Sequence, residues 1–185
     1  MSEIILTRTK RTDPRLLDLM DIHYSRPGGF VGRNRCFAIT YNGDYYGHIV
    51  GGSATRFLPG RDEFFGITDR DNELVHIINN IFYHIRPANE KYPEYNFTTK
   101  VVSKWRKVAT RDWENYYGDE VWGFETLIEL PRKGTLYRKD GWKEVGQTKG
   151  YTCKRIGGNG TDNWSGKRVW DTKNLKPKLV LVKGV

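Results

Sequence analysis

Residues 134–150 place a helical turn, a glycine and a strand in immediate succession. Leu136 and Tyr137 fit a short helical turn, and Gly141 fits the position just after a helix, where glycine adopts a left-handed backbone at little cost. Trp142 and the residues after it are typical of a strand. In this order, the large side chains can pack a helix onto a sheet. The stretch therefore predicts a fold in which helices and strands are combined.

Strand and helix patterns alternate along the rest of the chain. Asn42-Gly43 is a strong hairpin signal between two apolar runs. Asp13 and Pro14 suit the N-cap and first position of a helix, and a later apolar spacing predicts a longer helix that ends at Gly118. We expect one domain over residues 1–185, an α+β or α/β sheet with helices packed on it. The predicted strands are residues 4–7, 36–41, 45–52, 64–67, 74–85 with a break at Asn79-Asn80, 121–130, 151–155 and 178–183, and residues 157–168 form a Gly-rich basic loop.

The charge balance favours a polyanionic partner. The chain carries 31 Lys and Arg residues against 22 Asp and Glu, a formal net charge of +9. On a small domain this favours nucleic acid, and a soluble basic protein without such a partner is the alternative. The basic residues gather around residues 132–168, where a solvated charged face is again the alternative to a phosphate contact.

Cysteine use and hydrophobicity indicate the compartment. Cys36 and Cys153 are too few for a disulfide scaffold, which fits a reducing cytoplasm. No apolar run is long enough to span a bilayer, and the N-terminus lacks the order of a secretion signal. We therefore expect a soluble cytoplasmic protein without a membrane partner, and the sequence leaves monomer and dimer open.

The motifs resemble two groups of proteins. Residues 134–150 resemble the closing part of GNAT-type acyltransferases, in which the tyrosine, here Tyr137, lies beside the acyl donor and can protonate a leaving group. Residues 23–27, His-Tyr-Ser-Arg-Pro, resemble Mom-like phage DNA-modification proteins, which have a GNAT-like fold. The pieces that resemble the DruA proteins of Druantia defence systems are Asn79-Asn80, Phe82, Pro87, Asp112-Trp113, Tyr117-Gly118, Glu125-Thr126, Gly134-Thr135, Tyr137-Arg138, Trp142 and residues 145–150.

The resemblance implies a fold and an activity. The fold would be GNAT-like α+β, with a central mixed, mostly antiparallel sheet and helices packed on both faces. The activity would be that of a phage or mobile-element transferase in a bacterial host cell. It would add an acyl or carbamoylmethyl-type group to an exocyclic amine of DNA, at adenine N6, and so protect DNA from restriction. A non-catalytic DNA-binding module of a defence system and an ordinary GNAT N-acetyltransferase are the alternatives.

The resemblance also implies site residues. His23, Tyr24, Glu129 and Tyr137 are the catalytic candidates, and His23 suits a general base because its ordinary pKa lies near neutrality. His23, Tyr24 and Glu129 are also possible iron ligands, since imidazole and oxygen ligands suit that metal. The alternative for the aromatic residues is burial in the core. The candidate substrate or DNA contacts are Ser25, Arg26, Arg86, Arg138, Lys139, Trp142, Lys149, Lys154 and Arg155.

The donor is a separate question. GNAT enzymes that use acetyl-CoA normally carry a Gly-rich loop whose backbone N–H groups hold the pyrophosphate at a helix N-terminus. No such loop precedes Thr98, where the long helix is predicted to begin. The sequence therefore argues against an acyl-CoA donor and leaves the cofactor unknown.

Overall fold

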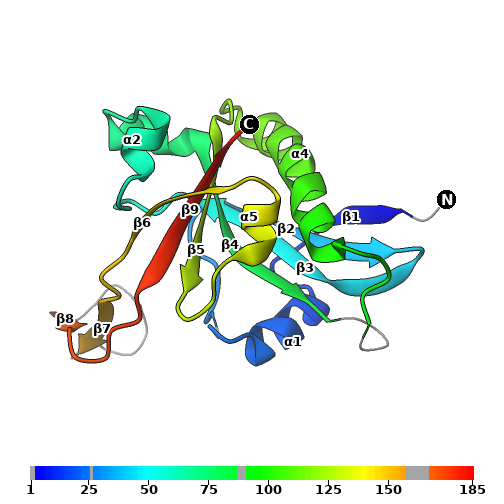
Figure 1. Ribbon diagram of the computed structural model, residues 1–185, viewed down its shortest axis with the longest axis horizontal. Helices are drawn as coiled ribbons and strands as arrows, with labels where there is room; N and C mark the ends of the chain where they lie inside the picture. Colours follow the sequence, from blue (N-terminus) through cyan, green and yellow to red (C-terminus); the bar gives the residue numbers. More distant parts are fainter. Residues whose placement is uncertain (1–2, 26, 87–90, 157–166) are drawn as a thin grey trace.

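The computed structural model describes residues 3–25, 27–86, 91–156 and 167–185, with the backbone alone at 152–156, 167–168 and 170–171 (Figure 1). The elements in chain order are β1 (Ile4–Thr9), α1 (Pro14–Ile22), β2 (Asn34–Tyr41), β3 (Asp44–Ser53), α2 (Arg61–Phe65), α3 (Arg70–Glu73), the 3-10 helix η1 (Leu74–His76), β4 (Ile77–Ile85), α4 (Phe97–Tyr117), β5 (Gly123–Glu129), α5 (Thr135–Lys139), β6 (Lys143–Gln147), β7 (Thr152–Ile156), β8 (Lys167–Asp171) and β9 (Lys178–Gly184).

Seven of the described strands form one mixed sheet in the order β1-β2-β3-β4-β5-β9-β6. Neighbouring strands in this sheet are antiparallel except β4 and β5, which run parallel. The parallel step is possible because α4 connects β4 to β5 and returns the chain to the starting edge. Strands β7 and β8 pair with each other in a separate two-stranded ribbon. The expected α+β fold with a mostly antiparallel sheet is confirmed.

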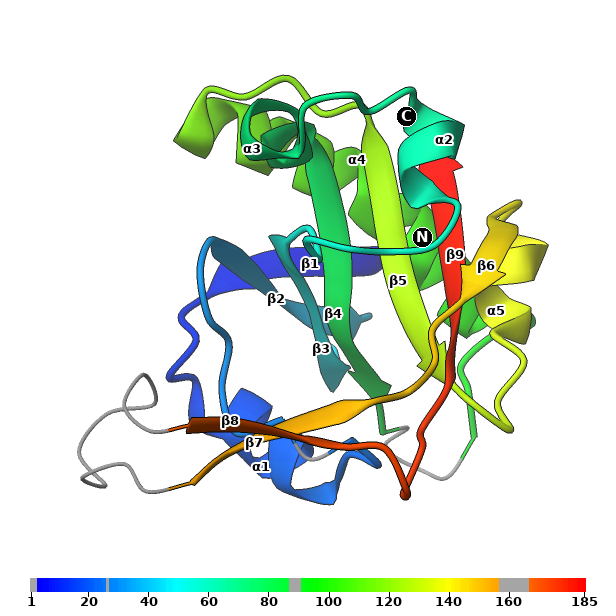
Figure 2. The same cartoon turned by 90° about the vertical axis from the view of Figure 1, so that its left-hand side faces the viewer.

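Helices cover both faces of the sheet. On one face, α4 packs Val102 and Trp105 against alternate side chains of the central strands, such as Phe37 and Ile49. The neighbouring side chains of the same strands point the other way, so Val50 packs against α1. Figure 2 shows α4 behind the sheet, with α2 and the β7–β8 ribbon on the near side. Each central strand is therefore buried on both faces, which explains its near-continuous apolar sequence.

Local signals position the predicted elements. The Asp13 side chain accepts a hydrogen bond from the Arg15 N–H as the N-cap of α1, with Pro14 at the first helical position. The turn between β2 and β3 has positive φ at both Asn42 (50°) and Gly43 (91°), as the Asn-Gly signal predicts. The long helix ends at a left-handed Gly118. These predictions are confirmed.

The predicted strand at 64–67 is wrong. Residues 61–65 form the short helix α2, which begins after Gly60 (φ 73°) and ends at Gly66 (φ 68°). Two left-handed glycines bracket one helical turn, and Phe65 packs with Leu58 against the outer strands. Tertiary packing and the glycines therefore override the strand preference of the aromatic residues.

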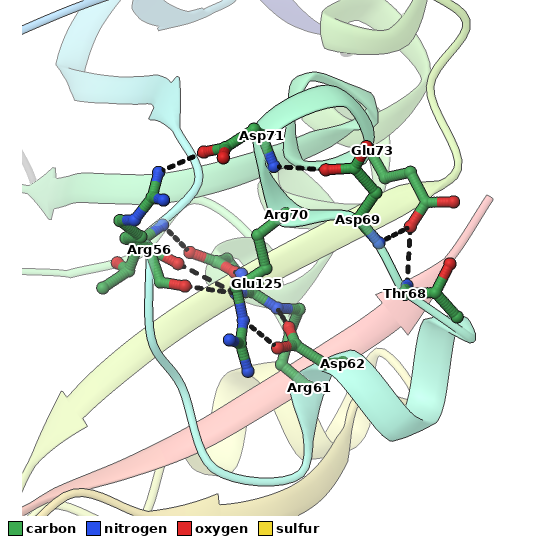
Figure 3. A network of polar contacts seen from close by, with 10 residues as sticks. Arg56, Arg61, Asp62, Thr68, Asp69, Arg70, Asp71, Glu73 and Glu125 are labelled. Carbon is green, nitrogen blue, oxygen red and sulfur yellow. Dashed lines mark hydrogen bonds and ion pairs between the residues drawn. The ribbon is translucent and has the colours of Figure 1, made fainter.

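The β3–β4 connection is fixed by a buried ion pair (Figure 3). Arg61 and Glu125 both have fully buried side chains and pair with each other. Glu125 also accepts a hydrogen bond from the Thr55 N–H (2.6 Å), while Arg61 donates to the Thr55 carbonyl (2.9 Å). Because each charge has a partner and further hydrogen bonds, its burial is tolerated. The network holds residues 54–65 against the face of β5.

Candidate functional site

Strands β4 and β5 pair over a short distance and then separate. Their parallel register covers Ile77 to Asn79 on β4 and ends at the pair Asn79–Glu125. Beyond this pair, β4 carries a bulge, because the register with β3 shifts between Phe82 and Asn80. The break expected at Asn79-Asn80 is therefore a bulge in a continuous strand. The separation of the two strands leaves room for a cavity in the middle of the sheet.

A cavity of about 630 Å³ lies between β4 and β5 and reaches both faces of the sheet. Its wall includes Thr98 at the beginning of α4 on one face and His23 at the end of α1 on the other. Tyr137 and Asn80 lie in the wall between these ends. A cavity of this size suits a small organic ligand or the reacting parts of two ligands.

Tyr137 and Asn80 form the polar centre of the cavity wall. The Tyr137 hydroxyl donates a hydrogen bond to Asn80 Oδ1 at 2.5 Å. Asn80 Nδ2 donates to the carbonyls of Val50 and Phe82, both at 3.1 Å. Since both amide protons are used, the amide oxygen has a fixed direction, toward Tyr137. The Thr126 hydroxyl donates to the Asn80 carbonyl at 3.1 Å and ties β5 to the same point.

Tyr137 is held in its protonated form. Burial raises the pKa of its hydroxyl, a side-chain hydrogen bond with Thr126 opposes this rise, and the nearby Tyr24 adds to it. The residue is 5% exposed, yet it lines the cavity. A neutral phenol that faces a cavity can donate a proton to a strong base that forms there, such as a thiolate or an alkoxide.

His23 has partners at both sides of its ring. Its Nδ1 accepts a hydrogen bond from the Ser25 N–H at 3.2 Å and lies 2.8 Å from Ser25 Oγ. A hydrogen bond with the Tyr83 backbone favours the protonated ring, but burial and the charges of His84 and Arg132 lower the pKa of His23 to about 4. The ring is therefore neutral at pH 7. Its packing against Tyr24, with ring centroids 4.3 Å apart, fits a positioning role.

Tyr24 and Arg132 form a stacked pair at the α1 end of the cavity. The Arg132 guanidinium carbon lies 3.7 Å from the Tyr24 ring centroid, and Tyr24 is 43% exposed. Burial raises the pKa of the Tyr24 hydroxyl, Arg132 lowers it, and Glu129 raises it again. The predicted residues Tyr24 and Glu129 are thus close enough to interact. The stacked Tyr24 and Arg132 side chains give this end a flat, cationic surface, with the Glu129 carboxylate near Tyr24.

The opposite end of the cavity is formed by the N-terminus of α4. Asn96, Thr98 and Thr99 line it, and the N-cap Asn96 has no side-chain capping hydrogen bond. The first N–H groups of a helix lack intrahelical acceptors, and the N-terminus carries a partial positive charge. The Lys139 ammonium lies beside it, 3.2 Å from Asn96 Oδ1. This end therefore suits a phosphate group, although the sequence lacks the usual Gly-rich loop.

The other predicted contacts fall into four groups. Ser25 and Lys139, which were predicted to contact substrate or DNA, line the cavity. Arg86, Lys149 and Arg138 lie outside it, and Arg138 pairs with Glu144. Trp142 is 4% exposed in the core, where its Nε1 donates to Asp140 (2.9 Å), so the prediction that it contacts substrate is wrong because the ring is covered. Arg26 lies outside the described residues, and so do the side chains of Lys154 and Arg155 on β7.

Three important positions were not among the predicted site residues. Asn80 and Thr126 orient Tyr137, and Arg132 stacks on Tyr24. The signal for Asn80 was a pair of asparagines inside an otherwise apolar strand, which is costly unless their amides are satisfied. The roles of Thr126 and Arg132 depend on where β5 ends relative to α1, which no local pattern gives.

The described residues offer no conventional metal centre. No group of three or more His, Cys, Asp or Glu side chains among them is placed to hold a metal ion. His23, one of the three possible iron ligands, has both sides of its ring engaged in hydrogen bonds. We therefore assign no step to iron. None of the helices in the described parts of the chain has the length and hydrophobicity needed to cross a bilayer.

Solved acetyltransferases share the fold over almost the whole chain. The aminoglycoside acetyltransferase AAC(6')-Ib, in complex with coenzyme A and kanamycin, is 14% identical, with 98% of this chain and 95% of that chain covered and a TM-score of 0.57. A GNAT family acetyltransferase from Elizabethkingia anophelis with acetyl-CoA bound is 13% identical, with 98% of both chains covered and a TM-score of 0.55. A Bacillus subtilis acetyltransferase in complex with CoA is 12% identical, with 99% of both covered and a TM-score of 0.53.

These likenesses establish the GNAT acetyltransferase fold. No protein-family profile matches the sequence, and no curated protein sequence matches it. The resemblance to Mom-like and DruA proteins therefore stays a hypothesis that depends on the order of short motifs. The fold itself is typical of proteins that transfer acyl groups.

Proposed function

We propose that this chain transfers an acyl group from a CoA-type thioester to an amine. The observation that carries the proposal is the Tyr137 hydroxyl, which is hydrogen-bonded to Asn80 in the wall of a cavity lined by residues from both faces of the sheet. Two substrates can then meet at Tyr137 from opposite sides. The α4 end, with its helix N-terminus and Lys139, suits the phosphates of the donor, which revises the expectation from the missing Gly-rich loop.

The reaction requires one proton donor and one proton acceptor. The amine nitrogen attacks the thioester carbonyl carbon, the C–N bond forms and the C–S bond breaks. Tyr137 gives its proton to the departing thiolate, and the amine loses one proton in exchange. The neutral His23 lines the acceptor end, and Glu129 lies close enough to Tyr24 to affect its pKa, so these two residues are the candidates to accept this proton.

The substitution Tyr137→Phe tests the assignment of the acid. General acids contribute about 10²–10⁴-fold to rate, so we expect kcat to fall by about that factor. Acetyl-CoA consumption and CoA thiol release with an amine acceptor measure the rate, and calorimetry of CoA binding serves as the control for an intact site. Unchanged kcat in a folded variant would remove Tyr137 from the mechanism.

We further infer that the acceptor is a nucleobase amine in DNA. The net charge of +9 and the exposed Tyr24–Arg132 stack support this, because a flat cationic surface suits an unstacked base and the phosphates beside it. A base in a duplex must leave the stack to reach such a cavity. The choice of adenine N6 and of an acyl or carbamoylmethyl-type group rests on the Mom-like resemblance. Protection of phage or mobile-element DNA from restriction would be the biological result.

Nucleoside mass spectrometry tests the acceptor. DNA from cells that express the wild-type chain should contain a new adenine adduct, and DNA from cells with Tyr137→Phe should not. The alternative, an ordinary N-acetyltransferase for small amines, predicts unchanged nucleosides together with CoA release on an aliphatic amine. A kanamycin complex of a protein with the same fold gives this alternative a concrete basis. A non-catalytic DNA-binding module would show neither product.

A further inference from the structure

The β7–β8 ribbon has no partner strand in the main sheet. Thr152 to Ile156 pairs antiparallel with Lys167 to Asp171, and the described residues place the two strands in a sheet of their own. Figure 2 shows the ribbon beginning below β6 and β9 and running across the lower near side of the molecule, in front of α1. It thus stands on the side of the sheet where the acceptor end of the cavity opens.

The base of the ribbon is fixed next to the cavity. The Thr148 N–H donates to the Lys178 carbonyl (2.9 Å), and the Lys176 N–H donates to the Gly150 carbonyl (3.0 Å). Gly150 has φ of 80°, and a Cβ there would lie 2.3 Å from the Lys176 carbonyl carbon, so only glycine lets the two chains come this close. Lys178, which takes part in this base, also lines the cavity. A ligand held by the ribbon is therefore held at the mouth of the site.

Positive charge is concentrated in this segment. Residues 149–178 contain eight Lys or Arg and two Asp, so these thirty residues hold a net charge of +6 out of +9 for the whole chain. In the ribbon, Arg155 is the register partner of Arg168. The backbone register therefore places two arginines at one level of the ribbon, where the sequence offers two cationic groups to a polyanion.

The connection between β3 and β4, on the same face, has the opposite charge. Residues 54–76 contain three Arg and five Asp or Glu. Arg56 pairs with Asp71 at 2.6 Å, and Arg70 pairs with Asp62 at 2.5 Å, so these cations are neutralised (Figure 3). A polyanion is therefore attracted to the ribbon side of the cavity and repelled from the α2 side.

We propose that the β7–β8 ribbon is a docking arm for duplex DNA that brings the acceptor base to the cavity. This inference rests on the proposed DNA acceptor. A two-stranded ribbon fits the major groove of B-DNA, whereas the major groove of A-form RNA is too narrow for it. Most of the binding free energy would come from phosphate contacts by the basic residues. The cavity residues would then act on one base extruded near the base of the ribbon.

Charge reversal at one register pair tests the arm. Arg155→Glu with Arg168→Glu should weaken binding to a fluorescent 20-base-pair DNA duplex about ten-fold or more at 0.1 M salt. It should also lower the slope of log affinity against log salt by about 2, since each lost phosphate contact removes about 0.9. The matched control is Lys107→Glu with Arg111→Glu, the same charge change at two exposed positions of α4, on the opposite face of the sheet.

The outcomes separate this inference from the proposed function. Selective loss of duplex affinity in the ribbon variant, with CoA binding retained by calorimetry, supports the arm. Unchanged affinity, an equal loss in the α4 variant, or equal wild-type affinity for a 20-base-pair RNA duplex would each overturn it. Failure of the wild-type chain to bind CoA would instead overturn the acyltransferase assignment. The duplex measurements would then still test whether the ribbon binds DNA.

Discussion

The Tyr137 hydroxyl is directed by an amide that has no freedom to turn. Both protons of the Asn80 amide are donated to backbone carbonyls of β3 and β4, so its oxygen faces Tyr137. The phenol is therefore protonated and held in a fixed position at the cavity, and its proton must turn from the Asn80 oxygen to reach a departing thiolate. The position of the Tyr137 hydroxyl therefore depends on the backbone of β3 and β4, which holds the Asn80 amide in place.

Lys139 and Arg138 form a matched pair for a test of donor binding. They are adjacent on α5, but Lys139 lines the cavity, whereas Arg138 points to Glu144. Loss of one exposed charge–phosphate contact costs on the order of 1 kcal/mol. We expect Lys139→Gln to raise the KM for acetyl-CoA several-fold with kcat little changed, and Arg138→Gln to leave both near wild type. Equal effects of the two substitutions would contradict the placement of the donor at the α4 end.

Two buried histidines predict a loss of stability in mild acid. Burial lowers the pKa of His48 and of His23 from 6.5 to about 4. Between these pH values the unfolded chain binds protons that the folded chain does not, so the free energy of unfolding falls as the pH drops from about 6.5 to about 4. The loss is about 1–3 kcal/mol for each histidine.

Urea unfolding from pH 7 to pH 4.5 measures this effect. The variant His48→Gln is expected to be less stable at pH 7, because it loses the hydrogen bond between the Tyr45 hydroxyl and His48 Nδ1 (2.6 Å). Its free energy of unfolding should also decline less steeply as the pH falls. A decline as steep as that of the wild type would show that His48 does not titrate as described.

At the scale of elements, the β3–β4 connection depends on one buried ion pair. Removing one partner of such a pair leaves the other charge buried, which costs about 3–5 kcal/mol. We expect Glu125→Gln to lower the free energy of unfolding by an amount of this order, because the Arg61 guanidinium loses its counter-charge. Arg56→Met, which removes an exposed ion pair with Asp71, should cost less than about 1 kcal/mol. Similar values for the two variants in urea unfolding would contradict the role of Glu125.

The elements also show where sequence patterns succeed and fail. Caps, turn residues and apolar spacing act locally, so α1, the Asn42-Gly43 hairpin and α4 were predictable from short windows. The strand predicted at 64–67 failed because two glycines and packing on β9 decide its conformation. No Gly-rich pyrophosphate motif precedes α4, but a helix N-terminus offers N–H groups whatever its sequence.

At the scale of the whole molecule, the site exists because β4 and β5 separate. The cavity joins the end of α1, the beginning of α4 and the helix α5, which are far apart in the chain. The position of Tyr137 in the cavity wall was predictable because its own neighbourhood carries a motif. Asn80 lies 57 residues from Tyr137, so no local pattern joins them. The proposed division of the cavity into a donor end and an acceptor end likewise follows from topology alone.

A crystal structure of the complex with CoA tests the central claim most directly. We predict that the phosphates lie at the N-terminus of α4 beside Lys139, and that the thiol sulfur reaches the middle of the cavity. The sulfur should then be within hydrogen-bonding reach of the Tyr137 hydroxyl, about 3–4 Å away. CoA bound elsewhere, or a sulfur beyond the reach of Tyr137, would contradict the account.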